Sequence, residues 1–386
     1  MKQYKGYVFR IYPDNNQKGL INKQLGTTRF IYNYFLDFKK REYEENKKTY
    51  SCFELIKMLP TLNKEYPFLK EVDSCILRNS LFNLDDSYKR FFNGGGYPKF
   101  KKKGIKDSFK TNNITSTYKG KNYNSIELDL INKTIKLPKL GLISIRGYRN
   151  RSKIEGNIKS ATVRKIAEKY YISVLIEEEI SIPTIKHSSI VGIDLGIKDM
   201  VVTSNGIKLN NPNSDRLDRL NKRLKGLNKS LSRKKLGSNN RYKLIIKIQE
   251  VYKKIKNLRK HLINRLANII VNNNDIITLE DLDIKNMYQE HNIAKRLVNI
   301  PLNNLIEAIK WKSYLLGKKV IQINRYYPSS QECSVCGSKN EKIKDLSIRK
   351  WECKSCGCIH DRDLNASINI MFEGLKLYMN NNLANI

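Results

Sequence analysis

Two cysteine pairs near the end of this 386-residue chain constrain its fold more than any other feature. Cys333 and Cys336 form one CxxC pair, Cys353 and Cys356 form the second, and sixteen residues separate the pairs. A glycine follows each pair, so the backbone can turn tightly enough for both thiolates to face one ion. Four thiolates at this spacing suit tetrahedral zinc and leave no position open for water, which predicts a structural zinc ribbon.

The remaining cysteines and a histidine leave the ligand set partly open. Cys358 and His360 follow the second pair as surplus ligands, either of which could replace a cysteine, and an iron–sulfur cluster is the alternative to zinc. Five of the seven cysteines lie within residues 333–358, whereas a secreted disulfide framework would spread them along a short chain. The clustering therefore indicates a metal site in a reducing compartment.

The chain carries a large excess of basic residues. Lysine and arginine total 73 against 37 acidic residues, which gives a formal net charge of +36. Such a charge repels itself in a compact fold unless a polyanion compensates it, so nucleic acid is the expected partner. An anionic membrane surface is the competing partner, but no apolar run reaches the roughly 18–20 residues that span a bilayer.

The basic excess is concentrated in residues 213–270, a long helical pattern that "KKLGSNN" (234–240) should turn into a helical hairpin. Between residues 215 and 260 there are 17 lysines and arginines and only three acids. A solvated helix face usually mixes the two signs, so this ratio favours contact with phosphates. The residues that we expect to bind nucleic acid are Arg216, Arg219, Lys222, Arg223, Arg233, Lys234, Lys235 and Arg241.

The N-terminal residues predict a strand followed by helices. Residues 4–12 alternate in polarity and are rich in aromatic and β-branched types, which indicates a strand. Asp14, with a glutamine three residues later, has the spacing of a capping box. The helix that should follow places these residues on one face: Ile21, Leu25, Thr28, Tyr32 and Phe35. More helix is expected over residues 51–92, with breaks near Pro60 and Pro67.

The pattern changes at "NGGGYPKFKKK" (93–103), which marks a domain boundary. Residues 105–180 hold short alternating runs that predict a small antiparallel β unit ending near Pro183. From residue 188 onward, strands are predicted in "SIVGIDLGIKDMVVTSNG", "NDIITLEDL" (274–282) and "KVIQINRYYP" (319–328). A helix precedes the last of these strands, with Leu302, Ile306, Ile309 and Leu316 on one side and Gly317 at its end.

The positions of three acids each have an ordinary structural explanation, but the three positions together do not. Asp194 lies within an apolar strand, Glu280 ends another, and an acid, Asp361 or Asp363, follows the cysteine pairs. Neighbouring strand ends and a nearby helix start can bring such acids to one point, where several carboxylates cannot all ionise without a cation. Mg²⁺ prefers oxygen ligands, and two ions can clamp the oxygens of a phosphodiester, so the pattern predicts a nuclease site.

Spacing alone does not choose between Asp361 and Asp363. The two residues lie about 200° apart on a helix, so we do not expect both to face the same metal ions. Asp361 could instead cap the helix that begins at this point.

The motifs "GIDLG", "LEDL", the two CxxC pairs and "DRDLNASINI" stand in the order of the nuclease core of the TnpB family. These are proteins of bacterial insertion sequences, related to the type V CRISPR effector nucleases. The segments "YVFRIYPDNNQKGLINKQLGTTRFIYNYFL", "GYPKFKKK", "KKLGSNN" and "YYPSSQECSVCG" are also similar to that family. The chain therefore resembles the TnpB family over essentially its whole length.

The resemblance implies an α+β multidomain fold. Its centre would be an RNase H-like (RuvC) α/β core interrupted by the zinc ribbon, beside an N-terminal β-barrel wedge domain that carries a helical recognition insertion. The implied division is wedge domain 1–12 and 98–185, recognition domain 13–97, RuvC-like nuclease domain 186–327 and 358–386, and zinc ribbon 328–357.

The resemblance also implies an RNA-guided DNA endonuclease of a mobile element, which cuts DNA next to a short flanking motif. Carried over by motif, the catalytic acids are Asp194, Glu280 and Asp363, and the resemblance implies that they bind Mg²⁺ as two ions. Asp363 stands two residues before asparagine in "DLNA". The implied partners are a guide RNA from the element end and double-stranded target DNA, with one protein per RNA, in the bacterial cytoplasm at the nucleoid. A nuclease-inactive guided repressor and an RNA-independent transposase or resolvase remain as alternatives.

Overall fold

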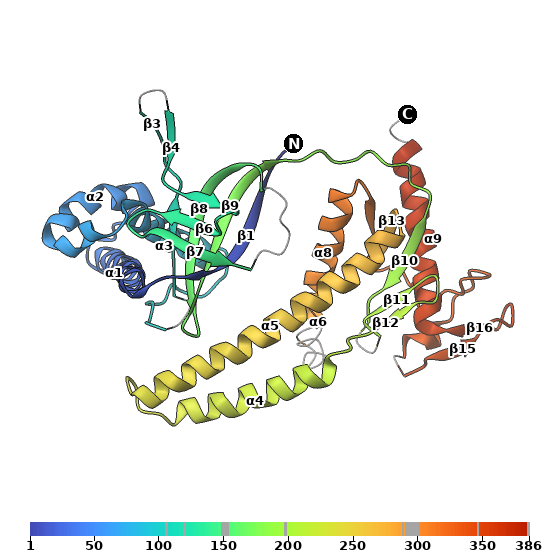
Figure 1. Cartoon of the computed structure of the whole chain (residues 1–386). Coiled ribbons are helices and arrows are strands. Elements are labelled where there is room, and N and C mark those ends of the chain that lie inside the picture. The colour runs from blue at the N-terminus through green and yellow to red at the C-terminus, as the bar shows by residue number, and fades with distance from the viewer. Residues whose placement is uncertain are drawn as a thin grey trace. The chain divides into compact units, whose positions relative to one another are not determined.

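The structure is a computed structural model that describes residues 1–104, 107–118, 121–147, 154–196, 199–287, 289, 301–345 and 347–383. The chain divides into two compact units, Met1–Ile180 with Ser230–Glu250 and Ser181–Lys229 with Val251–Ile386. Each unit combines helices with sheets, in agreement with the predicted α+β class (Figure 1). No helix in these described ranges is long and apolar enough to cross a membrane.

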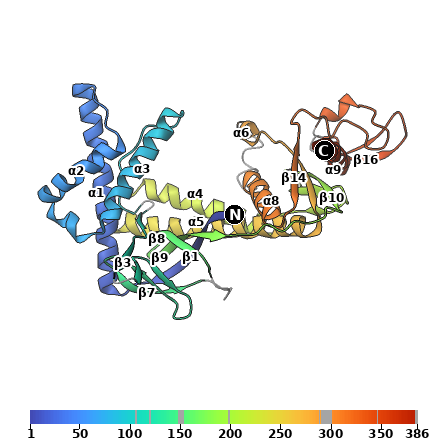
Figure 2. The same ribbon diagram turned by 90° about the horizontal axis from the view of Figure 1, so that it is seen from above.

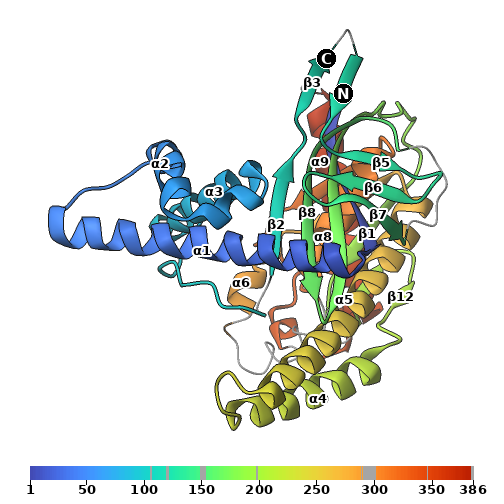
Figure 3. The same ribbon diagram turned by 60° about the vertical axis from the view of Figure 1, so that its left-hand side comes forward.

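The first unit is built on an antiparallel seven-stranded sheet in the order β2-β8-β9-β1-β7-β6-β5. Its strands are β1 (Lys2–Tyr12), β2 (Ser108–Asn112), β5 (Glu127–Asp129), β6 (Thr134–Leu137), β7 (Gly141–Arg146), β8 (Asn157–Ile166) and β9 (Lys169–Glu179). The predicted N-terminal strand and antiparallel unit are confirmed, and β1 lies between β9 and β7. Strands β3 (Thr115–Tyr118) and β4 (Lys121–Asn124) form a separate hairpin that projects beyond β2 (Figure 3).

Three helices lie together beside this sheet, α1 (Asn15–Asn46), α2 (Cys52–Glu65) and α3 (Ser74–Phe92) (Figure 2). The predicted capping box at Asp14 is present, and the predicted apolar face of α1 is buried. The first part of that face packs in the core of the sheet, whereas Tyr32 and Phe35 pack in a second core among the helices.

The two prolines of this helical region behave differently. Pro67 begins the 3-10 helix η1 (Pro67–Glu71), as the predicted break requires. The break predicted at Pro60 is wrong, because α2 continues through this residue. Pro60 is exposed, so its ring faces water, while Leu59 and Leu62 beside it stay buried in the helical core and hold the helix together.

The second unit is built on a five-stranded sheet in the order β12-β11-β10-β13-β14. Its strands are β10 (Ile190–Asp194), β11 (Val201–Thr203), β12 (Lys208–Leu209), β13 (Ile276–Glu280) and β14 (Lys319–Ile323). Four of them lie within the predicted stretches, whereas β12 follows the end of "SIVGIDLGIKDMVVTSNG" and was not predicted. β10, β13 and β14 are parallel, whereas β11 and β12 extend the sheet with antiparallel pairing. The carboxyl ends of the three parallel strands therefore meet at one edge of the sheet.

Helix α9 (Arg362–Leu383) packs against β10 and β13 (Figure 1). Two glycines permit this contact: a Cβ at Gly192 in β10 would collide with the Ser367 carbonyl oxygen, and a Cβ at Gly374 in α9 would collide with Thr278. Only hydrogen at these two positions lets the helix and the sheet approach so closely. Because Gly192 lies two residues before the end of β10, the contact places the start of α9 near the carboxyl edge of the sheet.

The other helices of the second half also follow the sequence closely. The predicted basic hairpin is confirmed as α4 (Ser214–Ser232) and α5 (Asn239–Asn273). Helix α8 (Leu302–Leu315) buries Leu302, Ile306 and Ile309, and Gly317 after it has a positive φ. Leu316 was expected on the buried side, but it lies past the last turn and is 42% exposed. A short helix, α6 (Ile284–Met287), follows β13.

The cysteine-rich segment has a small core of its own. It contains the 3-10 helix η2 (Glu341–Lys344) and an antiparallel pair, β15 (Lys350–Glu352) and β16 (Ile359–Asp361). Ile343 and Trp351 are buried there against two of the cysteines. α9 begins directly after β16, so this segment leads without a linker into the helix that packs on the sheet.

Candidate active site and metal centre

Two of the predicted acids lie at the ends of neighbouring parallel strands. Asp194 is the last residue of β10, Glu280 is the last residue of β13, and Ile193 pairs with Leu279 just before them. Continuing this register by one residue places the two acids opposite each other at the carboxyl edge of the sheet. Both side chains are partly buried.

The third acid reaches the same edge from α9. Asp363 lies in the first turn of that helix and is partly buried. Its negative charge acts on Asp194 together with that of Glu280, so the fold brings the three acids near one another. Asp194 and Glu280 are 86 residues apart in the chain, and Glu280 and Asp363 are 83 residues apart. Only the parallel strand pairing and the packing of α9 bring them together.

The proximity of these acids shifts their protonation. Burial raises the pKa of Asp194 to about 7, and the charges of Asp363 and Glu280 add to the shift. Burial also raises the pKa of Glu280 to about 7, although a hydrogen bond from Ser329 favours its ionised form. A cation between the carboxylates would counter both effects, so this donor set suits a hard divalent ion such as Mg²⁺.

The spacing of the acids differs from that of a single closed metal site. Within the described ranges, the four cysteines are the one group of three or more possible ligand atoms that all lie within 4.8 Å of one another. The three carboxylates do not form such a group in the structure. Two ions about 3.5–4 Å apart do not require all ligands in one sphere, so the set is compatible with a two-metal site.

The two aspartates that follow the cysteines have different partners. Nη1 of Arg349 donates to both carboxylate oxygens of Asp363 at 3.2 Å. Asp361 accepts from Nζ of Lys208 at 2.8 Å and from the backbone N–H of Leu364 at 3.2 Å, so it caps α9. Burial opposes ionisation, but Lys208 and backbone amides hold the pKa of Asp361 below its ordinary value. Asp361 thus already has the capping role that its position suggested.

The four predicted zinc ligands converge on one point. Sγ of Cys333 lies 3.6 Å from Sγ of Cys356, and Sγ of Cys336 lies 3.6 Å from Sγ of Cys353. Tetrahedral zinc with bonds of about 2.3 Å needs sulfur atoms about 3.8 Å apart, so the cluster fits this ion. The glycine after each pair has a positive φ, and its N–H donates to the carbonyl of the first cysteine, which closes the tight turn.

The two surplus residues lie outside this group of four. Nε2 of His360 is 3.1 Å from Sγ of Cys333, and the His360 ring packs against Trp351 with centroids 4.7 Å apart. The carbonyl of Cys358 accepts the backbone N–H of Cys353 at 2.9 Å. His360 is therefore placed to hydrogen-bond a ligand sulfur and orient it, which counting ligands in the sequence did not indicate.

The basic residues predicted to bind nucleic acid are mostly exposed. Seven of the eight are exposed on α4 and in the turn that follows it: Arg216, Arg219, Lys222, Arg223, Arg233, Lys234 and Lys235. Arg241 differs, because it is partly buried and its Nη1 donates to the Leu231 carbonyl at 3.0 Å. Arg241 thus joins the two ends of the hairpin turn, while the other seven remain accessible to phosphates.

Three residues that contact the acids were not predicted. Arg349 lies just before β15 and Lys208 lies on β12, outside every motif quoted above, whereas Ser329 follows β14 within the segment "YYPSSQECSVCG". The pairing of β15 with β16 puts Lys350 opposite Asp361, and this places Arg349 beside the start of α9. A strand pair predicted around the cysteines could have indicated Arg349. Lys208 and its partner Asp361 are 153 residues apart in the chain, and no sequence pattern indicates their contact.

Three family models match the chain. A model described as "Probable transposase" matches residues 171–291, and a "Helix-turn-helix domain" model of the same IS605 family matches residues 1–48. A "Cas12f1-like, TNB domain" model matches residues 303–370, which include all four clustered cysteines. In this chain, residues 1–48 contain β1 and the single long helix α1.

Curated relatives align along almost the whole chain. A protein of Streptomyces pristinaespiralis is 29% identical over 380 residues, 97% of this chain and 90% of that protein, and one of Escherichia coli K12 is 28% identical over 392 residues, 97% and 93%. Both carry the name "Putative RNA-guided DNA endonuclease", the second with the addition InsQ. TnpB-like protein L79 of Acanthamoeba polyphaga mimivirus is 26% identical over 210 residues, 50% of this chain and 38% of that protein.

Solved structures with similar chains include a Cas12f1–sgRNA–target DNA complex, with 18% identity and a TM-score of 0.36 over 96% of this chain and 99% of that one. Another is the mini-RNA-guided endonuclease CRISPR-Cas_phi3, with 10% identity and a TM-score of 0.48 over 97% and 92%. The family models and the relatives that span the sequence agree with the ordered motifs: the chain belongs to the TnpB family.

Proposed function

We propose that this protein is an RNA-guided, divalent-metal-dependent DNA endonuclease of a mobile element, which cuts DNA next to a short flanking motif. The observation that carries the proposal is the approach of Asp194, Glu280 and Asp363 at one sheet edge in a member of the TnpB family. The names of two relatives that align along almost the whole chain support the same activity. The net charge of +36 suits a protein that holds both an RNA and a DNA.

In this proposal a RuvC nuclease domain of RNase H-like fold is formed by residues 186–327 and 358–386, most of which lie in the second unit. The parallel strands β10, β13 and β14, with β11 and β12 at one side and α9 packed on them, support it. Residues 328–357 form the zinc ribbon. Residues 1–12 and 98–185 form the wedge domain around the seven-stranded sheet, and residues 13–97 form the helical recognition domain.

Asp194, Glu280 and Asp363 would hold the catalytic Mg²⁺, as two ions, through their carboxylate oxygens. Ions held there would supply positive charge for the attacking and leaving oxygens of a phosphodiester, with water as the expected nucleophile. The contact between Gly192 and α9 fixes the distance between the end of β10 and the first turn of α9, and so holds Asp363 relative to Asp194. The side chains of Arg349 and Ser329 hydrogen-bond Asp363 and Glu280, respectively.

The cysteine cluster would hold one structural zinc ion. β16 joins the second cysteine pair directly to α9, so zinc would order the chain just before Asp363. The guide RNA and the target DNA would contact the exposed basic residues of α4 and its turn. We propose one protein per RNA, in the bacterial cytoplasm at the nucleoid.

The test uses the protein purified with its native RNA and a matched DNA duplex that carries the flanking motif of its element. We expect Mg²⁺-dependent cutting that Asp194→Ala abolishes and that the control Asp215→Ala, an exposed acid of α4, preserves. Tight RNA-dependent binding without cutting under any divalent ion would instead identify a guided repressor. Full cutting after removal of the RNA would identify a transposase or resolvase.

A further inference from the structure

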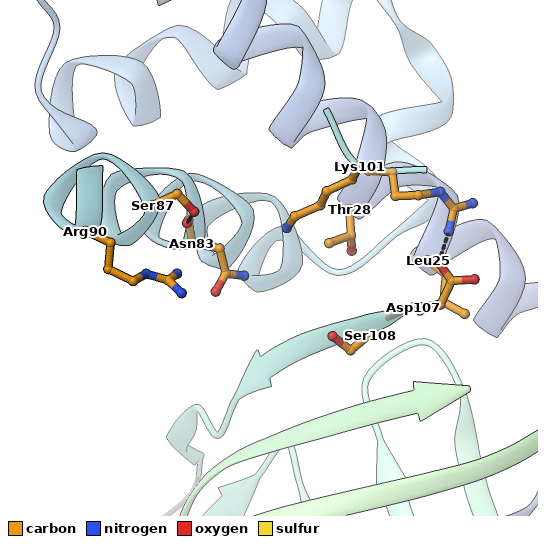
Figure 4. A pocket seen from close by; sticks show the side chains of 9 residues that line it. Leu25, Thr28, Asn83, Ser87, Arg90, Lys101, Asp107 and Ser108 are labelled. Carbon is orange, nitrogen blue, oxygen red and sulfur yellow. Dashed lines mark hydrogen bonds and ion pairs between the residues drawn. The ribbon is translucent and has the colours of Figure 1, made fainter. Parts of the chain in front are cut away.

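The first unit contains a cavity of about 170 Å³ with an almost entirely polar lining (Figure 4). The lining comes from α1, α3, the segment that joins α3 to β2, and the start of β2. Leu25 is its one apolar side chain, so the cavity offers no aromatic ring on which a base could stack. A small charged or strongly polar group is therefore a better occupant than a nucleobase or an apolar ligand.

The cavity carries an excess of positive charge. Three of its lining residues are cations, Arg29, Arg90 and Lys101, and one is an acid, Asp107. Asp107 already has partners, because it accepts from Nη1 of Arg29 at 2.8 Å and from the backbone N–H of Gly104 at 3.0 Å. Asp107 and Arg29 thus neutralise each other, and Lys101 and Arg90 remain as the uncompensated charges.

Lys101 is held rigidly at the cavity wall. Its backbone N–H donates to Oδ1 of Asn33 at 2.7 Å, and Nδ2 of Asn33 donates to its carbonyl at 3.0 Å. Nζ of Lys101 lies 3.8 Å from the centre of the Tyr32 ring, and no carboxylate of the described residues pairs with it. Burial lowers the pKa of this lysine to about 8. A partly buried ammonium group without a carboxylate is costly, and a bound anion would remove that cost.

Arg90 faces the same space from the last turn of α3. Asn83, Ser87 and Arg90 are spaced by four and three residues, so they lie on one face of the helix, and Figure 4 shows them together at the cavity. Nε of Arg90 donates to the Asp86 carbonyl at 3.0 Å. No ion pair to its guanidinium occurs among the described residues, so its two terminal nitrogens can bind an anion in bidentate fashion.

We propose that this cavity binds one backbone phosphate of a nucleic acid strand, with Lys101 and Arg90 as cationic ligands and the Asn83 amide as a neutral donor. A phosphodiester carries one negative charge, and its oxygens accept hydrogen bonds from ammonium, guanidinium and amide groups alike. The inference rests on the proposed function in that nucleic acid is the source of the phosphate. Free inorganic phosphate has related chemistry, and the test separates the two sources.

The test compares Lys101→Gln and Arg90→Gln with Lys99→Gln, an exposed lysine two residues from Lys101 that does not line the cavity. Affinities are measured over a range of salt concentrations without divalent ions, for RNA binding to the RNA-free protein and for duplex binding to the protein–RNA complex. We expect both lining variants to weaken binding in one arm and to reduce the slope of log K against log salt by about 0.7–0.9, the value for one phosphate. The control should keep the slope of the unmodified protein, and the arm that changes identifies the strand that is bound.

The proposal would be overturned if Lys101→Gln and Arg90→Gln both had the same salt slope as Lys99→Gln, for RNA binding and for duplex binding alike. Loss of inorganic phosphate binding in calorimetry with unchanged slopes would also overturn it, because the cavity would then bind free phosphate. If Lys101→Gln fails to fold, exposed Arg90→Gln supplies the same readout. Binding is measured separately from cutting. If the slopes are unchanged but the protein still cuts DNA, phosphate binding in the cavity is refuted and the proposed nuclease function is not. A reduced slope in a protein that never cuts refutes only the nuclease.

Discussion

Arg349 donates to both carboxylate oxygens of Asp363 at 3.2 Å, so a cation from the cysteine-rich segment is held on an acid of the candidate active site. The side chains are 44% and 20% exposed, so the pair stays in contact with water. Such pairs are weak enough to exchange partners. Asp363 can therefore turn from Arg349 to a divalent ion, which leaves the guanidinium free to face the negative charge of a bound phosphodiester.

This relationship predicts that Arg349→Gln slows DNA cleavage by about tenfold or more. A hydrogen bond to a charged group contributes about 1.5–3 kcal/mol, and the variant removes the cation that faces the reacting phosphate. Single-turnover cleavage of a matched duplex measures the rate, and filter binding measures RNA and DNA affinity, which we expect to stay within a few-fold. Lys350→Gln, an exposed neighbour, is the control. A rate equal to that of the unmodified protein would show that Arg349 takes no part in the reaction.

Substitutions at the two neighbouring aspartates should have opposite effects. Asp363→Ala removes a proposed metal ligand, so we expect cleavage to fall by at least about a hundredfold with little change in thermal stability. Asp361→Ala removes the cap of α9 and the partner of Lys208, so we expect a loss of about 1 kcal/mol in the free energy of unfolding with cleavage largely kept. Cleavage assays and thermal unfolding of both variants decide this, and the reverse pattern would assign the metal to Asp361.

The sequence indicates the parts of this site that depend on local pattern. Glu280 could be placed at a strand end because it follows a short apolar run, and four cysteines at ligand spacing locate the metal cluster. Asp194 was expected inside its strand, and the structure places it at the end of β10. Arg349 and Lys208 could not be found, because their contacts arise only after strand pairing and helix packing join distant segments.

The difference between local sequence pattern and tertiary contacts also explains where the predicted fold was wrong. β12 was missed because two residues carry no alternation, and only their pairing with β11 makes them a strand. The break expected at Pro60 failed because burial of Leu59 and Leu62 outweighs the loss of one helical hydrogen bond. Tertiary packing, which no local pattern contains, decided both cases.

The raised pKa values of Asp194 and Glu280 predict how stability depends on pH. Without divalent ions the folded protein keeps protons on these groups up to about pH 7, whereas the unfolded chain releases them near their ordinary values of 3.8 and 4.5. The folded state then binds more protons in this window, so its contribution to the free energy of unfolding falls as the pH rises toward 7. Added Mg²⁺ should restore stability above that pH, where the carboxylates are ionised.

Urea unfolding of the metal-free protein at several pH values measures this effect. The difference in unfolding free energy between the unmodified protein and Asp194→Asn isolates one group, and we expect it to decrease from about pH 4 to about pH 7. Asp215→Asn, which changes an exposed acid, should leave the pH dependence as it is. A difference that grows with pH would mean that Asp194 is ionised in the metal-free fold.

Removal of one clustered cysteine should separate the structural metal from the catalytic one. Cys353→Ser leaves three thiolates in a group whose four sulfur atoms lie within 4.8 Å of one another, so we expect zinc to be lost from the purified protein. Elemental analysis measures zinc, and limited proteolysis should show new cleavage within residues 328–357, where Ile343 and Trp351 lose their packing.

Loss of zinc should weaken loading of the target strand and slow cleavage, because β16 connects the cluster to the first turn of α9 and so to Asp363. Binding of RNA should be retained, since the first unit and the basic hairpin do not contain the cluster. Cys358→Ser is the matched control, because that cysteine lies outside the group of four and contributes its backbone carbonyl. Full zinc content in Cys353→Ser, or equal zinc loss in the control, would contradict the assignment of these four thiolates as the ligands.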